Sequence, residues 1–242
     1  MKLITVNIWG GRMVAPLTDF LKKYADVDMF LFQEIFEHDK SSKPIDHPLA
    51  QITELLTNHV GYYRRAESGG FGLATFVKRS LKVTAEGDTF VHGIKDAVVG
   101  ERWWYDVGKN LQYVTLHDSG TEYTVFNLHG LWEPTGKSDS PNRIKQSERI
   151  IEFMKKFGGN VLLGGDFNLR PDTESLKMIE QELGLKNLIK EYKITSTRTS
   201  LYTRTDEKYA DYVFVSPNMT VNEFQVLPDV VSDHAALFVD YK

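Results

Sequence analysis

The chain has 242 residues, of which 41% are apolar, and its 29 basic and 33 acidic side chains give a formal net charge of -4. So balanced a charge argues against a protein that coats nucleic acid by bulk attraction. The absence of cysteine excludes disulfide scaffolds, thiolate metal sites and cysteine nucleophiles. The longest run without a charged residue, 212–222, is far shorter than the ~18 apolar residues that a membrane span needs.

These bounds predict a soluble protein, and since the chain has no internal repeat, low-complexity tract or composition shift, we expect one domain over residues 1–242. The apolar stretch at the start of the sequence is interrupted by Asn7 and Gly10, and it lacks a small-residue cleavage site. This pattern favours a strand over a signal peptide. Cysteine usage leaves the compartment open, and the cytoplasm is our expectation.

Short runs rich in Val, Ile, Phe or Tyr predict nine strands. In chain order they are Lys2–Ile8, Met29–Phe32, Phe71–Val77, Leu111–Leu116, Tyr123–Leu128, Val161–Leu163, Asp211–Val215, Val221–Val226 and Leu237–Val239. The turn-forming residues 118–121 lie between the fourth and fifth runs and predict an antiparallel hairpin there.

Four segments between the strands show helical spacing of apolar residues. Their stripes are Val14, Leu17, Leu21 and Tyr24; Leu49, Ile52 and Leu56; Ile144, Ile151 and Met154; and Leu176, Ile179 and Leu183. The third and longest helix opens near Ser140-Pro141 and closes at Gly158-Gly159. Helices interspersed with strands, one pair of them a hairpin, indicate mixed sheets covered by helices.

Polar side chains gather at the ends of the predicted strands. Asn7, Gln33, Glu34, Asn127, His129, Asp166 and Asn168 follow strands, and Asp211 and Asp233 precede later ones. Strand ends at one edge of a sheet bring distant residues to a common site. Oxygen donors and imidazoles without sulfur suit Mg²⁺, with Mn²⁺ as the alternative, better than zinc or copper. These residue types therefore allow metal-assisted hydrolysis of a phosphoester.

Six local strings, taken together in this order, resemble the endonuclease/exonuclease/phosphatase superfamily, which includes deoxyribonucleases, abasic-site endonucleases, inositol polyphosphate phosphatases and neutral sphingomyelinases. The strings are Thr5-Val6-Asn7-Ile8-Trp9, Leu31-Phe32-Gln33-Glu34, Asn127-Leu128-His129-Gly130, Gly164-Gly165-Asp166-Phe167-Asn168, Ala210-Asp211-Tyr212-Val213-Phe214-Val215-Ser216 and Ser232-Asp233-His234. The resemblance runs from residue 5 to residue 240. It implies one catalytic domain with an α/β four-layer sandwich, in which two mixed β-sheets carry helices on both outer faces.

The resemblance also implies roles for the motif residues. Glu34 would be the principal metal ligand, with Asn7 and Asp233 completing the coordination around it. Asp166 and Asn168 would lie beside the scissile phosphate, and Asp166 would orient or deprotonate the attacking water.

Two histidines complete the implied catalytic set. His234 would contact the phosphate or transfer a proton, and Asp211 would hold its ring in one tautomer. His129 takes the position where abasic-site endonucleases carry a tyrosine, and it would stabilise the pentacovalent charge or protonate the leaving oxygen. Glu67 is a candidate partner of His129, although its spacing from the strand at Phe71 fits poorly.

Substrate contacts are less defined. Arg102 is a candidate phosphate ligand, and a solvated or Trp-stacked role remains an equal alternative. Trp132, three residues after His129, is the best placed of the aromatic platforms, whereas packing is the default for Trp9, Trp103 and Trp104.

The remaining basic residues fit no motif. Lys137, Arg143, Lys145 and Arg149 could frame a phosphate-rich ligand, but their helical spacing favours a solvated face paired with Glu148 and Glu152. His38, His47, His59, His92 and His117 are interpreted as surface or packing residues.

The sequence thus predicts a monomeric, Mg²⁺-dependent phosphohydrolase that cleaves a phosphodiester or a phosphomonoester. A DNA endonuclease, abasic-site or end-processing, is the nearest alternative, and the low basicity and His129 count against its abasic-site form. A non-catalytic scaffold that retains the fold is the alternative from another class. Specificity would lie in the loops Phe36–Pro48, Thr89–Asn110, Gly130–Asn142 and Lys193–Tyr209, none of which identifies the substrate.

Overall fold

The computed structural model describes residues 1–37, 48–66, 71–94, 107–204 and 206–242, and these form two six-stranded sheets. The first sheet has the order β11 (Val221–Val226), β12 (Leu237–Tyr241), β1 (Lys2–Asn7), β2 (Met29–Phe36), β4 (Phe71–Lys78) and β3 (His59–Arg65). The second has the order β5 (Lys82–His92), β6 (Lys109–Asp118), β7 (Thr121–His129), β8 (Asn160–Asp166), β10 (Asp211–Val215) and β9 (Lys186–Asn187). Both sheets are mixed, because β1–β2 and β7–β8 are parallel and the other described pairs are antiparallel.

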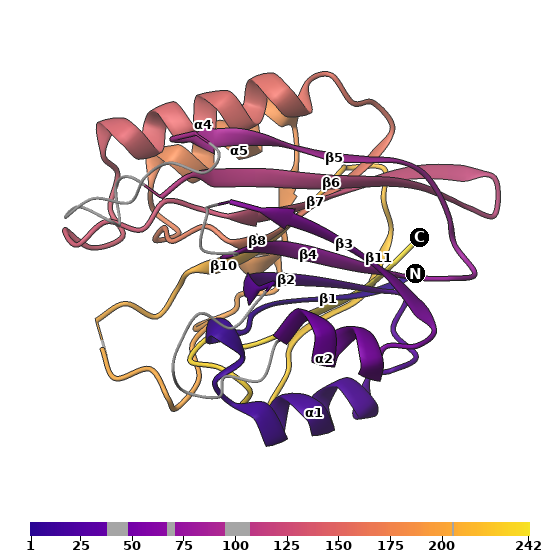
Figure 1. The fold of residues 1–242 in the computed structure, drawn as a ribbon. Helices are drawn as coiled ribbons and strands as arrows, with labels where there is room; N and C mark the ends of the chain where they lie inside the picture. Colours follow the sequence, from indigo (N-terminus) through magenta and orange to yellow (C-terminus); the bar gives the residue numbers. More distant parts are fainter. Residues whose placement is uncertain (38–47, 67–70, 95–106, 205) are drawn as a thin grey trace.

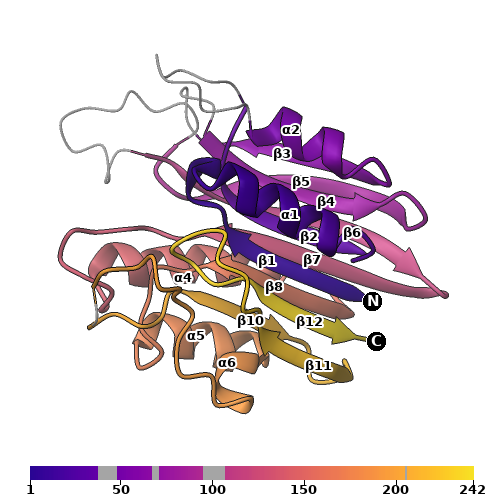
Figure 2. The same cartoon turned by 90° about the horizontal axis from the view of Figure 1, so that it is seen from below.

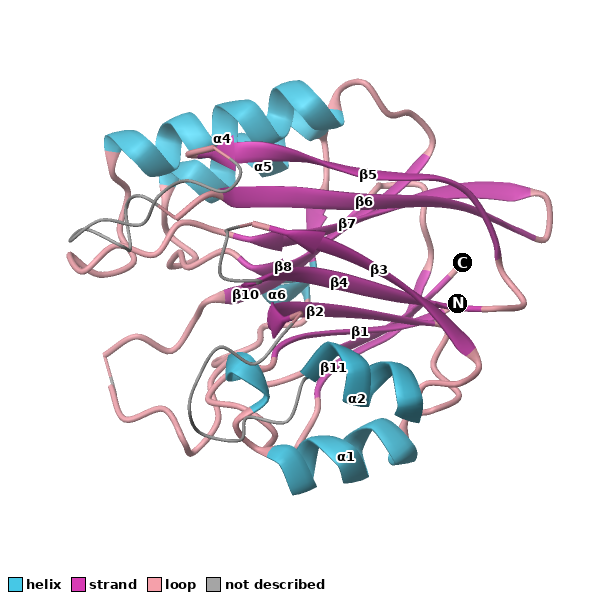
Figure 3. Cartoon of the chain, viewed as in Figure 1, coloured by secondary structure: helices cyan, strands magenta, loops and turns pink. Residues whose placement is uncertain are grey.

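Helices cover the two outer faces of the stacked sheets (Figure 1). The first sheet carries α1 (Val14–Lys23) and α2 (Pro48–Leu55), and the second carries α4 (Pro141–Met154) and α5 (Glu174–Leu183). Two short helical segments, η1 (Trp9–Gly11) and α6 (Leu188–Glu191), complete the described elements. The view from below and the colouring by secondary structure show the same layers (Figures 2 and 3). The predicted four-layer sandwich is confirmed.

The central strands are buried on both faces, which explains their continuous apolar runs. In β2, Met29 and Leu31 pack into the core between the sheets, whereas Phe30 and Phe32 pack against the helical layer of α1 and α2. This alternation follows from the two-residue period of a strand. All nine predicted strands and the four predicted helices are present, and the turn at 118–121 joins β6 to β7 as predicted.

The strand ends position the site. The chain termini lie together at one edge of the sandwich, where β1 pairs with β12 (Figure 1). The strands β1, β2, β7 and β8 end at the opposite edge, so the polar residues at their carboxyl ends gather there. Among the described residues, no helix is both long and apolar enough to cross a membrane.

Candidate active site

Strand register brings three site residues into one row. In the second sheet, His129 at the end of β7 lies opposite Asp166 of β8, and Asp166 lies opposite Asp211 of β10. Directly opposed residues in a sheet project to the same face. The pairing therefore brings together three residues of which the first and the last are more than 80 positions apart in the sequence.

Two glycines allow the strands that carry this row to approach closely. Gly165 precedes Asp166 with φ +140°, and a Cβ atom there would lie 2.1 Å from the carbonyl oxygen of Leu128. Gly130 follows His129, and a Cβ atom there would lie 2.5 Å from the carbonyl oxygen of Phe167. Because no other residue fits these contacts, both glycines maintain the spacing of the two site strands.

Left-handed backbone conformations also concentrate at this edge. Glu34 has φ +57° at the point where the pairing of β2 with β4 shifts its register. Trp9 and Asn168, which line the same pocket, have φ +52° and +53°. Such conformations are strained for residues other than glycine and are often kept where a side chain must be aimed at a functional site.

The side chain of Asn7 joins the two sheets at the site. Its Nδ2 donates to Glu34 Oε1 and to Asp166 Oδ2, both at 3.0 Å. Its Oδ1 accepts a hydrogen bond from the backbone N–H of Trp9 at 2.9 Å, which fixes the orientation of the amide. Asn7 thus faces the carboxylates with its donor group.

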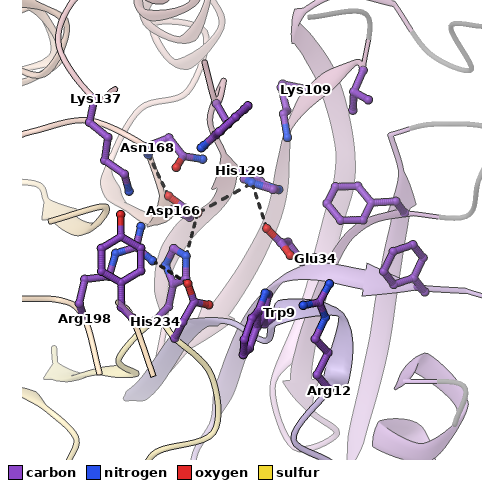
Figure 4. Close-up of a pocket in the computed structure, with 16 residues that line it drawn as sticks. Trp9, Arg12, Glu34, Lys109, His129, Lys137, Asp166, Asn168, Arg198 and His234 are labelled. Atoms are coloured by element: carbon purple, nitrogen blue, oxygen red, sulfur yellow. Dashed lines mark hydrogen bonds and ion pairs between the residues drawn. The ribbon is translucent and has the colours of Figure 1, made fainter. Parts of the chain in front are cut away.

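Asp166 Oδ2 is also the meeting point of two imidazoles (Figure 4). His129 Nε2 lies 3.8 Å from this oxygen and 3.8 Å from Glu34 Oε1, while His234 Nε2 approaches it to 3.6 Å. The other ring nitrogen of His234, Nδ1, donates to Asp211 Oδ1 at 2.9 Å. Since Asp211 only accepts hydrogen bonds when ionised, it orients the His234 ring with Nε2 toward Asp166.

The surrounding charges set the protonation of these groups. Burial by itself raises the pKa of Asp166, but the charges of His234 and His129 outweigh burial and hold that pKa well below its usual range. Burial, reinforced by the charge of Lys109, lowers the pKa of His129 well below its usual value. Near neutral pH, Asp166 is therefore ionised and His129 is neutral.

Glu34 responds differently. Its side chain remains 27% exposed, toward the pocket. Burial raises the pKa of its carboxyl above the usual value, and the hydrogen bond from Asn7 only partly offsets this rise. A nearby cation would stabilise the ionised form of this carboxylate. The oxygen donors of the pocket suit a metal cation in that role.

Asp166, Asp211 and His234 offer ligand atoms that lie within 4.8 Å of one another, so this buried group could also hold a metal ion. Two of its atoms already satisfy each other through the hydrogen bond between Asp211 and His234. The group is therefore better suited to orienting an imidazole than to replacing Glu34 as a metal ligand.

Glu34, His129, Asp166, Asn168 and His234 line a pocket of about 420 Å³. Asn7 and Asp211 do not line it, but they hydrogen-bond to Asp166 and His234, which do. Of the further predicted residues, Trp132 and Asp233 also line it. Asp233 Oδ2 contacts Arg198 Nη1 at 3.4 Å. Arg102, Glu67, Trp103, Trp104, His38 and His47 lie outside the described residues.

Four cationic residues of the pocket were not predicted as site residues: Arg12, Lys109, Lys137 and Arg198. Lys109, Lys137 and Arg198 come from three of the four loops to which the sequence assigned specificity, and Lys137 also belongs to the basic cluster that could frame a phosphate-rich ligand. The predicted solvated face is wrong for Lys137, which precedes α4 and is 3% exposed, and for Arg143, which is 1% exposed. Tertiary packing buries both, whereas Lys145 and Arg149 are exposed on α4.

Trp9 lines the pocket, where the guanidinium of Arg12 lies 4.7 Å from its ring centre, so its predicted packing role is incomplete. His59 is a packing residue, as predicted: it is 3% exposed, and its Nε2 lies 2.7 Å from the carbonyl oxygen of Val27.

Comparison with solved structures finds the same fold in proteins of low sequence identity. An endonuclease/exonuclease/phosphatase family protein from Bacteroides thetaiotaomicron is 21% identical with a TM-score of 0.77, and the match covers 100% of this chain and 97% of the other. A mannosyl-6-phosphatase from Bacteroides thetaiotaomicron VPI-5482 is 20% identical with a TM-score of 0.76, covering 100% and 99%. TDP2 from D. rerio, complexed with a single-strand DNA product, is 15% identical with a TM-score of 0.75, covering 100% and 98%.

Comparison with curated proteins finds no significant match. The model of the "Endonuclease/Exonuclease/phosphatase family" matches residues 4–234, nearly the whole chain. This match agrees with the two-sheet sandwich and with the site at the edge where its motif residues meet. The chain therefore belongs to the endonuclease/exonuclease/phosphatase family.

Proposed function

We propose that this protein is a metal-dependent hydrolase of phosphoric esters, with Mg²⁺ as its cofactor and a phosphomonoester or phosphodiester as its substrate. One observation carries the proposal: Asn7, His129 and His234 surround a single oxygen of the buried Asp166. A carboxylate flanked by two imidazoles of different protonation is suited to orienting water and moving protons.

The pocket also fits a hard divalent ion. Its donors are carboxylate, amide and imidazole groups without sulfur, and Glu34 is the partly exposed carboxylate whose ionised form burial disfavours. Glu34 would hold the ion, while the Asn7 amide keeps Glu34 and Asp166 facing one another. When bound, the ion would polarise a phosphoryl oxygen.

The chain's own residues would carry the proton transfers. Asp166 orients a water molecule for attack, and Asn168, whose backbone N–H donates to Asp166 Oδ1 at 2.8 Å, lies beside the phosphate. The Nε2 atom of His234 faces the same space and, with its proton, contacts a phosphate oxygen. His129, which is neutral near neutral pH, donates a hydrogen bond to the oxygens of the phosphate on which negative charge develops.

Proteins with a similar fold are named for different phosphoesters. This supports a phosphoester substrate but does not select one. The solved structures include a protein named as a mannosyl-6-phosphatase and TDP2 bound to a single-strand DNA product. A DNA nuclease therefore remains the second candidate, although the net charge of -4 disfavours a long polyanion.

The proposal is tested by turnover of a generic monoester and a generic diester with Mg²⁺. We expect Asp166→Asn and His234→Ala each to lower kcat/KM by about 10²–10⁴, the range for a proton-transferring side chain. Lys145→Ala, on the exposed face of α4, is the control and should retain full activity. Undiminished turnover in both site variants would refute the proposal, and a wild type that neither hydrolyses an ester nor binds Mg²⁺ in calorimetry would favour a scaffold.

A further inference from the structure

Lys137 occupies the pocket without a role in the mechanism above. The residue is 3% exposed, and its Nζ has no hydrogen-bond partner among the described residues. Burying an ammonium group without a partner costs free energy. Such a group is therefore expected where a bound anion pairs with it. Its charge faces the substrate pocket that Asp166 and Asn168 also line (Figure 4).

The backbone of Lys137 is held independently of its side chain. Its N–H donates to Glu207 Oε1 at 3.1 Å, and its carbonyl oxygen accepts from the backbone N–H of Arg170 at 3.0 Å. Hydrogen bonds of the Lys137 main chain therefore fix the loop, and the ammonium group takes part in neither of them. Its position is that of a group preorganised for a ligand.

Arg198 reaches the same place from another loop. Its side chain is 7% exposed, its guanidinium lies 4.0 Å from the centre of the Tyr202 ring, and its Nε has no hydrogen-bond partner among the described residues. The backbone of Arg198 forms an isolated antiparallel bridge with His234. This pairing places the two main chains side by side, and the guanidinium is held by the Tyr202 ring and by Asp233 Oδ2, 3.4 Å from Nη1.

We propose that Lys137 and Arg198 form a phosphate-binding subsite beside Asp166 and His234, and that this subsite selects a dianionic phosphomonoester over a singly charged phosphodiester. The inference rests on the proposed hydrolase function and adds the class of its substrate. The Lys137 ammonium and the Arg198 Nε–H supply donors to the phosphate oxygens.

The charge of the pocket supports a dianion. Among the described lining residues, four side chains are cationic and three are carboxylates: Arg12, Lys109, Lys137 and Arg198 against Glu34, Asp166 and Asp233. A bound divalent ion makes the excess of positive charge larger. A phosphomonoester carries about 1.5 to 2 negative charges at neutral pH and a diester one, so the monoester neutralises more of this excess. The volume of about 420 Å³ suits a small molecule.

The subsite is tested by calorimetric titration with inorganic phosphate in the presence of Mg²⁺. We expect Lys137→Met, which keeps an unbranched stem and removes the ammonium group with its charge, to weaken phosphate binding about tenfold to a hundredfold. Arg198→Gln should weaken it comparably. Lys145→Met is the matched control, because it removes an exposed lysine from α4, and it should bind like the wild type.

Thermal unfolding of the same variants separates binding from folding. Removing an unpartnered buried charge leaves nothing unsatisfied, so Lys137→Met should melt at or above the temperature of the wild type. A variant that folds normally and binds phosphate within twofold of the wild type would overturn the subsite. So would a wild type that does not bind phosphate at millimolar concentration.

Ester selectivity tests the substrate class. We expect the wild type to prefer p-nitrophenyl phosphate over bis(p-nitrophenyl) phosphate, and Lys137→Met to lower kcat/KM for the monoester at least tenfold more than for the diester. Equal losses on both esters would overturn the selection of a dianion. A wild type that hydrolyses neither ester contradicts the proposed function, whereas the phosphate titration still decides the subsite.

Discussion

His129 and His234 approach the same oxygen of Asp166, yet their pKa values move in opposite directions. Burial and the charge of Lys109 lower the pKa of His129. Burial alone would also lower the pKa of His234, but the carboxylates of Asp211 and Asp166 outweigh it and raise the pKa. One ring is therefore neutral where the other binds a proton more readily, which is the division of labour expected of an acid–base site.

Asp211 should control the protonation and orientation of His234. In Asp211→Asn the charge that favours the imidazolium is lost, so the pKa of His234 should fall and kcat should drop by about 10²–10⁴. Titration of the His234 ring by NMR gives the pKa, and steady-state kinetics give kcat. Asp19→Asn, an exposed change on α1, is the control. An unchanged pKa of His234 in Asp211→Asn would show that the 2.9 Å contact has no influence on the ring.

The ionised Glu34 side chain should lower the stability of the metal-free protein and should bind the metal ion. Because its folded pKa is raised, the unfolded chain ionises this carboxyl more easily, and its contribution to stability falls as pH rises from the unfolded pKa through the folded one. Glu34→Gln should therefore be more stable than the wild type in EDTA at neutral pH. Mg²⁺ at about a hundred times Kd should stabilise the wild type by about 2.7 kcal/mol and the variant by far less.

Thermal melts with Mg²⁺ and with EDTA measure both effects of the Glu34 change. Lys145→Ala should show the wild-type response to Mg²⁺, because it removes only an exposed side chain of α4. If Glu34→Gln keeps the full Mg²⁺-induced rise in Tm, Glu34 does not hold the ion.

Residues at strand ends could be predicted from the sequence, whereas the loop cations could not. Asn7, His129 and Asp166 follow β-rich runs inside recognisable strings, and they meet through hydrogen bonds and close charge contacts. The helical spacing of Lys137 with Arg143, Lys145 and Arg149 favoured a solvated face, and Arg198 stands in a segment without a motif. Whether such a cation is solvated, paired or buried without a partner depends on loops that meet only in the tertiary structure.

The same limit applies to the elements. Strands β1, β2, β8 and β10 lie inside the sheets, so burial on both faces gives them apolar runs. Two edge strands were not predicted: β3 is largely half-buried, and β5 is half-buried or exposed at all but one position and contains Gly87. Their chemistry resembles that of a loop, since an edge strand needs few apolar residues. The two-residue β9 and the short α6 are too brief to produce a period.

Gly165 should be essential for the pairing of β7 with β8. In Gly165→Ala the added Cβ meets the Leu128 carbonyl, and φ +140° is strained for alanine. We expect a loss of roughly 3 kcal/mol in the free energy of unfolding, together with lower kcat/KM, because His129 and Asp166 sit on these two strands. Gly158→Ala, with no atom within 4 Å of its added Cβ, is the control and should change stability by less than about 0.5 kcal/mol. Urea unfolding that gives equal stabilities for the two variants would contradict the argument.

At the scale of the whole molecule, the site depends on how the two sheets are stacked. Asn7 and Glu34 belong to the first sheet, and His129 and Asp166 belong to the second. Behind them, a buried amide network crosses the apolar interface, centred on Asn127 of β7. Its Oδ1 accepts from Gln33 Nε2 at 2.7 Å, and its Nδ2 donates to the carbonyl oxygens of Phe32 and Ala74 at 3.2 and 3.3 Å. Such a network specifies one arrangement of the sheets.

Truncating the centre of this network should cost more than removing a complete hydrogen-bonded pair. Asn127→Ala removes the hydrogen bond from Gln33 and those to two core carbonyls without filling the space, so we expect a loss of about 2–3 kcal/mol in the free energy of unfolding. The double change Thr115→Val and Thr124→Val removes both partners of a buried 3.0 Å bond within the second sheet and should be nearly neutral. Urea unfolding compares the two.

Activity shows whether the network also aligns the site. Gln33 precedes Glu34, and Asn127 lies two residues before His129, so a shift between the sheets moves metal-binding and proton-transferring groups apart. Asn127→Ala should therefore lower kcat/KM even under conditions where it is fully folded, whereas the threonine pair variant should not. A folded Asn127→Ala enzyme with wild-type kcat/KM would mean that the pairing across Asn7 alone maintains the alignment of Glu34 with Asp166.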